Sequence, residues 1–177
     1  MEQFTVSVRK SLKEKNWNAA LFIALTLPDI CSRLEADDNK ANGERYALWF
    51  DKYLKKVNTM SFGAVHHVFM TGDDCYVLRC SMLHQGFSDV SHQRRKGVLD
   101  RFYFTSMAMH RIQISNMLHL NVEQFCLEMV SAVEEWFDDF LSSHPDKHHR
   151  LADMLIIHES SYSVGPVMFG GEGDKSA

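Results

Sequence analysis

One arginine and one histidine, separated by four residues, lie in the segment GDDCYVLRCSMLHQG at residues 72–86. Arg79 offers a planar fork of N–H donors that suits an RNA phosphate. His84 can accept or donate a proton near neutral pH, so the two side chains together could act on the RNA backbone. The alternative is structural. Arg79 would then pair with a carboxylate such as Asp74 or Asp51, and His84 would stabilise the negative end of a helix.

The spacing of Arg79 and His84 restricts how the two side chains could act on one substrate. Five residues along an α-helix turn through about 500°, so the two side chains leave the helix about 140° apart. They should therefore not share one helix face. They could still converge on one substrate if a second copy of the helix packs alongside, or if the helix loosens before Gly86.

Cys80 forms a second candidate pair with His84. These residues are four apart, so they share a helix face, as a nucleophilic cysteine and its histidine base require. No orienting Asn or Asp can be assigned from the sequence. The alternative is that Cys80 is a core residue, because free cysteines on apolar helix faces commonly are.

Histidines suggest a third kind of site. His144 and His148 have the spacing of helical metal ligands, His149 is adjacent, and His66 with His67 could join them. Pro145 argues against a continuous helix around His144, and SSHPDKHHR resembles a solvated turn. We therefore predict no metal site.

A basic cluster follows the segment that contains Arg79 and His84. Arg94, Arg95 and Lys96 lie in SHQRRKG and could guide RNA phosphates, although the same residues suit a solvated loop. The acidic side of the helix expected at 121–142 is the opposite feature, and it could face solvent or a basic protein partner.

Four or five helices must position these residues. We expect helices over residues 3–14, from 16–18 to 37–38, over 42–56, over 72–86 and over 121–142, with hydrophobic residues at helical spacing. The expected caps are Asn42, Thr71 or Asp73, and Asn121, and Gly86 should stop the fourth helix. Pro28 should kink or restart the second helix, with Thr26 as a new cap.

The hydrophobic period changes near residue 101. Residues 101–105 and 110–115 alternate in polarity and are rich in aromatic or β-branched residues, so we expect one small β-hairpin at 101–115. Residues 57–71 are ambiguous. We expect one mainly α domain, a helical bundle with this hairpin, at 1–158, and a flexible tail at 159–177.

Bulk properties narrow the class. The chain has 177 residues, 45% of them hydrophobic, which is enough for one compact core. A net charge of −4 argues against a DNA-coating protein. Four scattered cysteines without CxxC spacing, no apolar signal segment and no run long enough for a membrane span predict a soluble cytoplasmic protein. No cofactor-binding motif is present, so no cofactor is expected.

The helical order resembles that of the HEPN superfamily of small abortive-infection and toxin-type proteins. The resemblance covers roughly residues 16–86: NAALFIALTLPDICSRLEA, an aromatic helix and YVLRCSMLHQG. It implies a helical bundle, a homodimer, and a metal-independent endoribonuclease of a bacterial or phage defence-type system, with Arg79 and His84 as catalytic residues. Cys80 and Gly86 depart from the pattern of active members. Such a family also includes non-catalytic members that bind nucleotides or proteins.

Three functions therefore remain open from the sequence. The first is an RNA-binding protein or ribonuclease that uses Arg79 and His84. The second is a non-enzymatic module that binds a protein partner and in which both residues are structural. The third is a sensor of a small ligand or nucleotide, with a pocket between the hairpin and the bundle.

Overall fold

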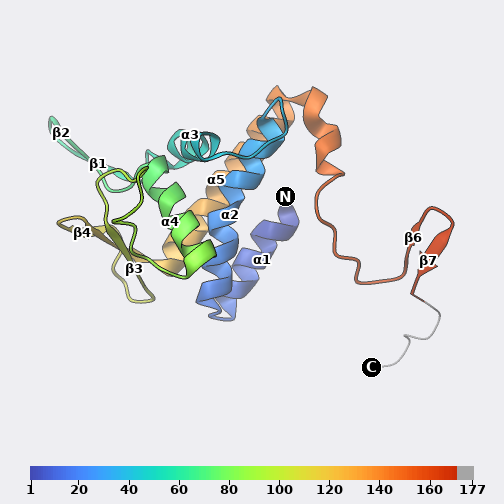
Figure 1. The fold of residues 1–177 in the computed structure, drawn as a ribbon, viewed down its shortest axis with the longest axis horizontal. Helices are drawn as coiled ribbons and strands as arrows, with labels where there is room; N and C mark the ends of the chain where they lie inside the picture. Colours follow the sequence, from blue (N-terminus) through green and yellow to red (C-terminus); the bar gives the residue numbers. More distant parts are fainter. Residues whose placement is uncertain (171–177) are drawn as a thin grey trace.

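The computed structural model describes residues 1–170 and is mainly α-helical (Figure 1). In this part of the chain there are five α-helices, one 3-10 helix and seven short strands. In chain order the elements are α1 (Glu2–Lys13), α2 (Trp17–Glu35), α3 (Gly43–Leu54), β1 (Thr59–Phe62), β2 (Val65–Val68), α4 (Gly72–Gln85), β3 (Arg101–Thr105), β4 (Ile112–Ile114), β5 (Met117–Asn121), α5 (Val122–Ser143), η1 (Pro145–Leu151), β6 (Tyr162–Val164) and β7 (Val167–Phe169).

Helices α2 and α5 form the centre of the bundle, and α1, α3 and α4 pack around them (Figure 1). Their apolar faces meet in one continuous core, whose largest fully buried side chains include Trp136, Tyr46, Phe50 and Phe140. The predicted caps are present: the side chains of Asn42 and Asn121 each accept a bond from a backbone N–H three residues further on. The expected mainly α bundle is confirmed, and each of the five α-helices buries apolar side chains in this core.

Pro28 does not restart α2. The helix runs uninterrupted from Trp17 to Glu35, and the hydroxyl of Thr26 donates back to the carbonyl of Ile23 instead of capping a new helix. Proline normally destabilises a helix interior because it lacks an N–H donor. Here Pro28 is buried, and the fully buried residues Leu27 before it and Cys31 after it hold this part of the helix in the core. The prediction of a new helix start was therefore wrong.

The predicted hairpin at 101–115 is also wrong in its pairing. Strands β3 and β4 exist, but β5 lies between them, in the order β3-β5-β4. Strand β5 is parallel to β3 and antiparallel to β4. Its alternate residues Leu118 and Leu120 are fully buried with Phe102 of β3, so burial of this one apolar face of the sheet favours the pairing.

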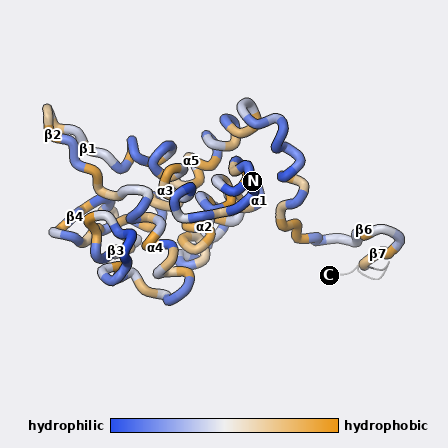
Figure 2. Tube along the Cα trace, turned by 45° about the horizontal axis from the view of Figure 1, so that its top comes forward, coloured by the Kyte–Doolittle hydropathy of each residue, from blue (hydrophilic) through white to orange (hydrophobic). Residues whose placement is uncertain are grey.

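Two further hairpins complete the described chain. The ambiguous residues 57–71 contain the antiparallel pair β1 and β2, and the predicted tail contains the pair β6 and β7. The segment after η1 leaves the bundle and carries β6 and β7 away from it, although β7 is apolar (Figure 2). The last part of the predicted flexible tail, 171–177, lies outside the described residues. Within residues 1–170, no helix has the length and hydrophobicity needed to cross a bilayer.

Candidate functional site

Helix α4 is fixed at both ends by local sequence signals, as predicted. Thr71 caps its start in a capping box with Asp74, and Gly86 ends it in the left-handed conformation, with φ of 74°. The buried Asp74 carboxylate also accepts a bond from the backbone N–H of Gly97, at 2.9 Å. The helix that carries Arg79 and His84 therefore has a defined length and orientation.

The side chains of Arg79 and His84 meet within one chain. Nη1 of Arg79 lies 3.3 Å from Nε2 of His84, near the C-terminal end of α4. The expectation that their directions would keep them apart was wrong, because the long arginine side chain reaches around the helix to the histidine ring. Arginine can only donate, so a hydrogen bond between these two atoms requires Nε2 of His84 to accept, with the ring proton on Nδ1.

Asp29 of α2 is the carboxylate that pairs with Arg79. Its Oδ2 accepts a bond from Nε of Arg79 at 2.8 Å, and the two side chains are 15% and 23% exposed. From the sequence we expected Asp74 or Asp51 as the partner, and this prediction was wrong. Both carboxylates accept hydrogen bonds from backbone N–H groups instead: Asp74 from Thr71 and Gly97, and Asp51 from Gly72.

Burial dominates the electrostatics of Asp29. It raises the pKa of the Asp29 carboxyl, and the charge and hydrogen bond of Arg79 lower that pKa by less. Burial alone would lower the pKa of Arg79, but attraction to Asp29 and contacts with Cys80 bring it above its ordinary value. The ion pair thus compensates only part of the cost of placing a carboxylate between α2 and α4.

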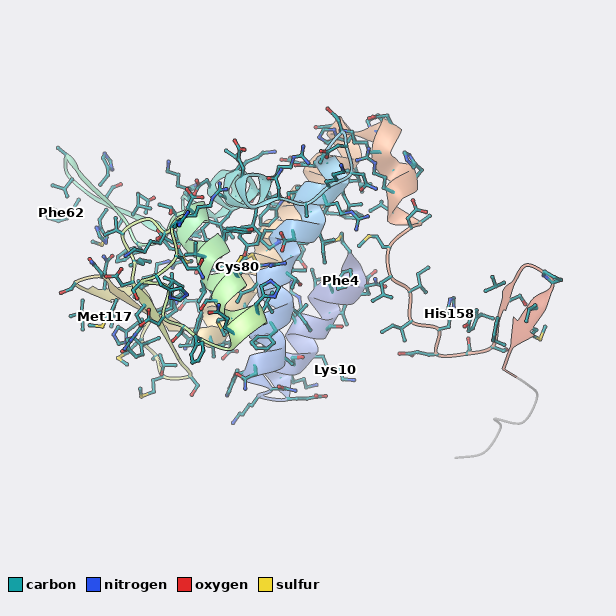
Figure 3. The ribbon with its side chains drawn as sticks, in the orientation of Figure 1. Phe4, Lys10, Phe62, Cys80, Met117 and His158 are labelled. Atoms are coloured by element: carbon teal, nitrogen blue, oxygen red, sulfur yellow. The ribbon has the colours of Figure 1, made fainter. Side chains whose placement is uncertain are left out.

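Cys80 and Tyr76 complete the surroundings of Arg79 on α4. Cys80, which Figure 3 labels on this helix, has its Sγ 4.0 Å from Nη1 of Arg79 and is half-buried. Burial raises the pKa of Tyr76, and a hydrogen bond to Cys80 adds to this increase. Among the hydrogen bonds of the described residues, none joins Cys80 to His84. The geometry therefore does not support the nucleophilic pair.

The basic loop, which contains Arg94, Arg95 and Lys96, lies beside the first turns of α4. Two of its three cationic side chains form ion pairs with carboxylates. Nε of Arg95 donates to Asp73 at 2.6 Å, and its guanidinium lies over the ring of Tyr76 at 5.6 Å. Lys96 pairs with Asp100. Arg94 is exposed and forms no ion pair with any residue in the described chain. This loop is thus close to α4, but only Arg94 offers an unpaired charge.

The histidines considered as metal ligands are divided between separate places. His66 bonds to Ser61 and His67 to Gln113, whereas His148 and His149 bond to backbone carbonyls near η1. Within residues 1–170, no group of three or more His, Cys, Asp or Glu side chains could hold a metal ion.

Sequence reasoning missed Asp29 and Tyr76. Asp29 is separated from Arg79 by fifty residues, so no local spacing links the two. One signal was available: Asp29 is a lone carboxylate in the apolar stretch ALFIALTLPDI, where a charge needs a partner. Tyr76 precedes Arg79 by three residues on α4, and its ring contacts Arg95.

Comparison of the chain with protein-family models, with curated proteins and with solved structures found no match.

Proposed function

We propose that this chain binds RNA and cleaves it as a metal-independent endoribonuclease of the HEPN-like kind, in a bacterial or phage defence-type system. One observation carries the proposal: Nη1 of Arg79 and Nε2 of His84 lie 3.3 Å apart at the accessible end of α4. A guanidinium that binds a phosphate and an imidazole that transfers a proton can reach the same phosphodiester when they lie this close together.

The proposed reaction uses the RNA 2′-hydroxyl as the nucleophile. His84 takes the proton from that hydroxyl through Nε2, and the oxygen attacks the adjacent phosphorus. The bond to the 5′-oxygen breaks, and this leaving oxygen gains a proton from a second acid. The products are a 2′,3′-cyclic phosphate and a free 5′-hydroxyl. The Arg79 guanidinium stabilises the negative charge that gathers on the phosphate oxygens.

Two features of the surroundings suit these roles. Asp29 holds Nε of Arg79, which leaves N–H groups on Nη1 and Nη2 for a phosphate. Because Nε2 of His84 carries a lone pair in the present arrangement, it can serve as the base once a phosphate takes over the donors of Arg79. His84 of a second copy would supply the acid, so the proposal includes a homodimer.

The test is cleavage of a broad panel of RNAs in EDTA by the wild type and by Arg79→Ala and His84→Ala. We expect the wild type to cut and each variant to lose about a hundredfold or more in rate, the usual range for an acid–base or oxyanion-stabilising group. The matched controls are Arg9→Ala and His149→Ala, which remove the same residue types from exposed positions outside α4 and the basic loop. Circular dichroism must show that all four variants are folded.

Equal cleavage by the wild type and the Arg79 and His84 variants would exclude the proposed site. Cleavage that requires a divalent metal would exclude the mechanism. A comparison with RNA that carries a 2′-deoxynucleotide at the scissile position adds a direct check. This nucleotide cannot supply the 2′-hydroxyl nucleophile, so the substitution must abolish cutting.

A protein-interaction module is the second candidate. It is favoured by the ion pair of Arg79 with Asp29, and by exposed apolar side chains outside the helical bundle, including Phe62 (85% exposed) and Ile157 (77% exposed). In that case no RNA is cut, and Arg79→Ala lowers the melting temperature instead. A thermal melt of the same variants therefore distinguishes the two functions.

A further inference from the structure

A cavity of about 330 Å³ lies between the start of α1, the second half of α2 and the segment that follows η1. Figure 3 labels Phe4 at this end of α1, facing the chain that leaves η1. No residue of α4 lines the cavity, so it is separate from Arg79 and His84 and shares with them only α2, which carries Asp29. Its walls are Phe4, Ile30, Arg33, Leu34, Asn39, Arg150, Asp153, Met154 and Leu155.

The inner wall of the cavity is apolar. Leu34 is buried, and Phe4, Ile30 and Met154 are half-buried and pack against the core. The volume is near the lower limit for small-molecule pockets, which span roughly 300–1,000 Å³. A small apolar body would gain stability by covering these side chains, since removal of apolar surface from water is favourable.

The polar rim carries more positive than negative charge. Arg33 and Arg150 line it with the single carboxylate of Asp153, and none of the three forms an ion pair within residues 1–170. Arg150 is engaged by backbone: its Nη1 donates to the carbonyls of Leu34 at 2.8 Å and Ala36 at 2.6 Å, at the end of α2. It is therefore a wall of the cavity rather than a free donor.

Arg33 is the donor that remains available. Its Nε donates to the carbonyl of Asn39 at 3.2 Å, which fixes the guanidinium beside the cavity. Its Nη1 and Nη2 groups have no hydrogen-bond acceptor in the described part of the chain. A planar pair of N–H donors at the mouth of an apolar cavity matches the two oxygens of a carboxylate.

Hydrogen bonds hold the outer wall in place. Nε2 of Gln3 donates to the carbonyl of Leu155 at 2.6 Å, and the bonds of Arg150 join η1 to the end of α2. The cavity is thus formed before any ligand arrives, so binding does not have to order this wall.

We propose that this cavity binds an anionic amphiphile, a monocarboxylate with an unbranched apolar body of about ten carbon atoms. The carboxylate accepts from Nη1 and Nη2 of Arg33. The hydrocarbon lies along Phe4, Ile30 and Met154. This site is independent of the proposed ribonuclease, and its test does not use RNA.

The experiment is isothermal titration of the full chain with decanoate below its micelle concentration. We expect saturable binding at one site per chain. Arg33→Gln should weaken it about tenfold or more, because it removes a charge-assisted bond. Decanol, which lacks the carboxylate, should bind the wild type about tenfold more weakly. The matched control is Arg94→Gln, an exposed arginine on another loop, which should leave binding unchanged.

A second variant tests the cavity rather than the charge. Ile30→Trp fills the apolar wall and should abolish decanoate binding while circular dichroism shows an intact fold. The proposal is overturned if decanoate fails to saturate the protein up to about one millimolar. It is also overturned if the wild type binds decanol as tightly as decanoate, or if Arg33→Gln binds decanoate as tightly as the wild type does. Binding of decanoate by Ile30→Trp would overturn it as well.

Discussion

Two carboxylates are bonded at α4, and they differ in how completely each is bonded. At the start of the helix, Asp74 is 2% exposed and accepts bonds from the Thr71 N–H, the Thr71 hydroxyl and the Gly97 N–H. Beside the middle of the helix, the carboxylate of Asp29 from α2 accepts one hydrogen bond, from Arg79, whose Nη1 faces a second polar group, His84.

This difference separates a structural cluster from one that can bind a ligand. The bonds of Asp74 come mainly from backbone, so they tie the helix start to the loop at Gly97 and leave nothing for a ligand. Arg79 keeps donors that the fold does not use, beside an exposed histidine. Perturbed, incompletely bonded charges are typical of functional sites. The predictions below test whether stability depends on the first cluster and function on the second.

Asp74→Ala should have the largest effect on stability. It removes the capping box and leaves the hydroxyl of Thr71 and the N–H of Gly97 without their acceptor, so we expect a loss of about 3 kcal/mol. Urea denaturation measures this loss. Asp73→Ala is the matched control on the same turn: its ion pair with Arg95 is exposed, and it should cost under about 1 kcal/mol. Equal losses in the two variants would contradict the comparison.

Gly72→Ala should follow in size. A Cβ at Gly72 would lie 2.1 Å from the backbone oxygen of Ala47, so α4 and α3 must separate, at a cost of about 2 kcal/mol. Gly63→Ala is the comparison variant, because it has a positive φ of 60° but no atom within 4 Å of the new Cβ. It should cost about 1 kcal/mol from backbone conformation alone. A thermal melt in which Gly63→Ala lowers the melting temperature more than Gly72→Ala does would disprove the close packing of α4 against α3.

Arg79→Ala and His84→Ala should change stability less than Asp74→Ala. Arg79→Ala leaves the mostly buried carboxylate of Asp29 without its partner, so we expect a loss of about 2 kcal/mol in free energy of unfolding. His84 lies at the surface, so His84→Ala should lose about 1 kcal/mol or less. Urea denaturation beside Asp74→Ala makes the comparison direct. A loss as large as that of Asp74→Ala would assign the Arg79 cluster to the fold and favour the interaction module.

The smallest effect concerns the pH dependence of Asp29. Burial raises the pKa of its carboxyl in the folded state, so the folded protein binds more protons than the unfolded chain. Stability from this group is therefore greatest at low pH and falls as pH rises above about 4, the unfolded value. The difference in unfolding free energy between wild type and Asp29→Asn should decrease from about pH 4 towards neutrality. A difference that grows with pH would show that Arg79 outweighs burial.

Features that depend on neighbouring residues could be predicted from the sequence. Thr71 and Gly86 marked both ends of α4, and Asn42 and Asn121 marked the starts of α3 and α5. A cap binds a backbone group three residues away, so its signal is local. The sheet was mispredicted because strands β3 and β4 look like a hairpin, whereas MLHLN of β5 supplies the central strand.

The mainly helical class, the caps of α3, α4 and α5, and the presence of an arginine and a histidine on one helix follow from the sequence alone. Hydrophobic period and capping residues are properties of a short stretch of chain, so they can be recognised there. The contact of Arg79 with His84, the ion pair of Asp29 with Arg79, and the place of Arg33 beside a cavity walled by the segment after η1 depend on the tertiary structure. These contacts join residues far apart in the chain, and their geometry follows from how the helices pack rather than from local spacing.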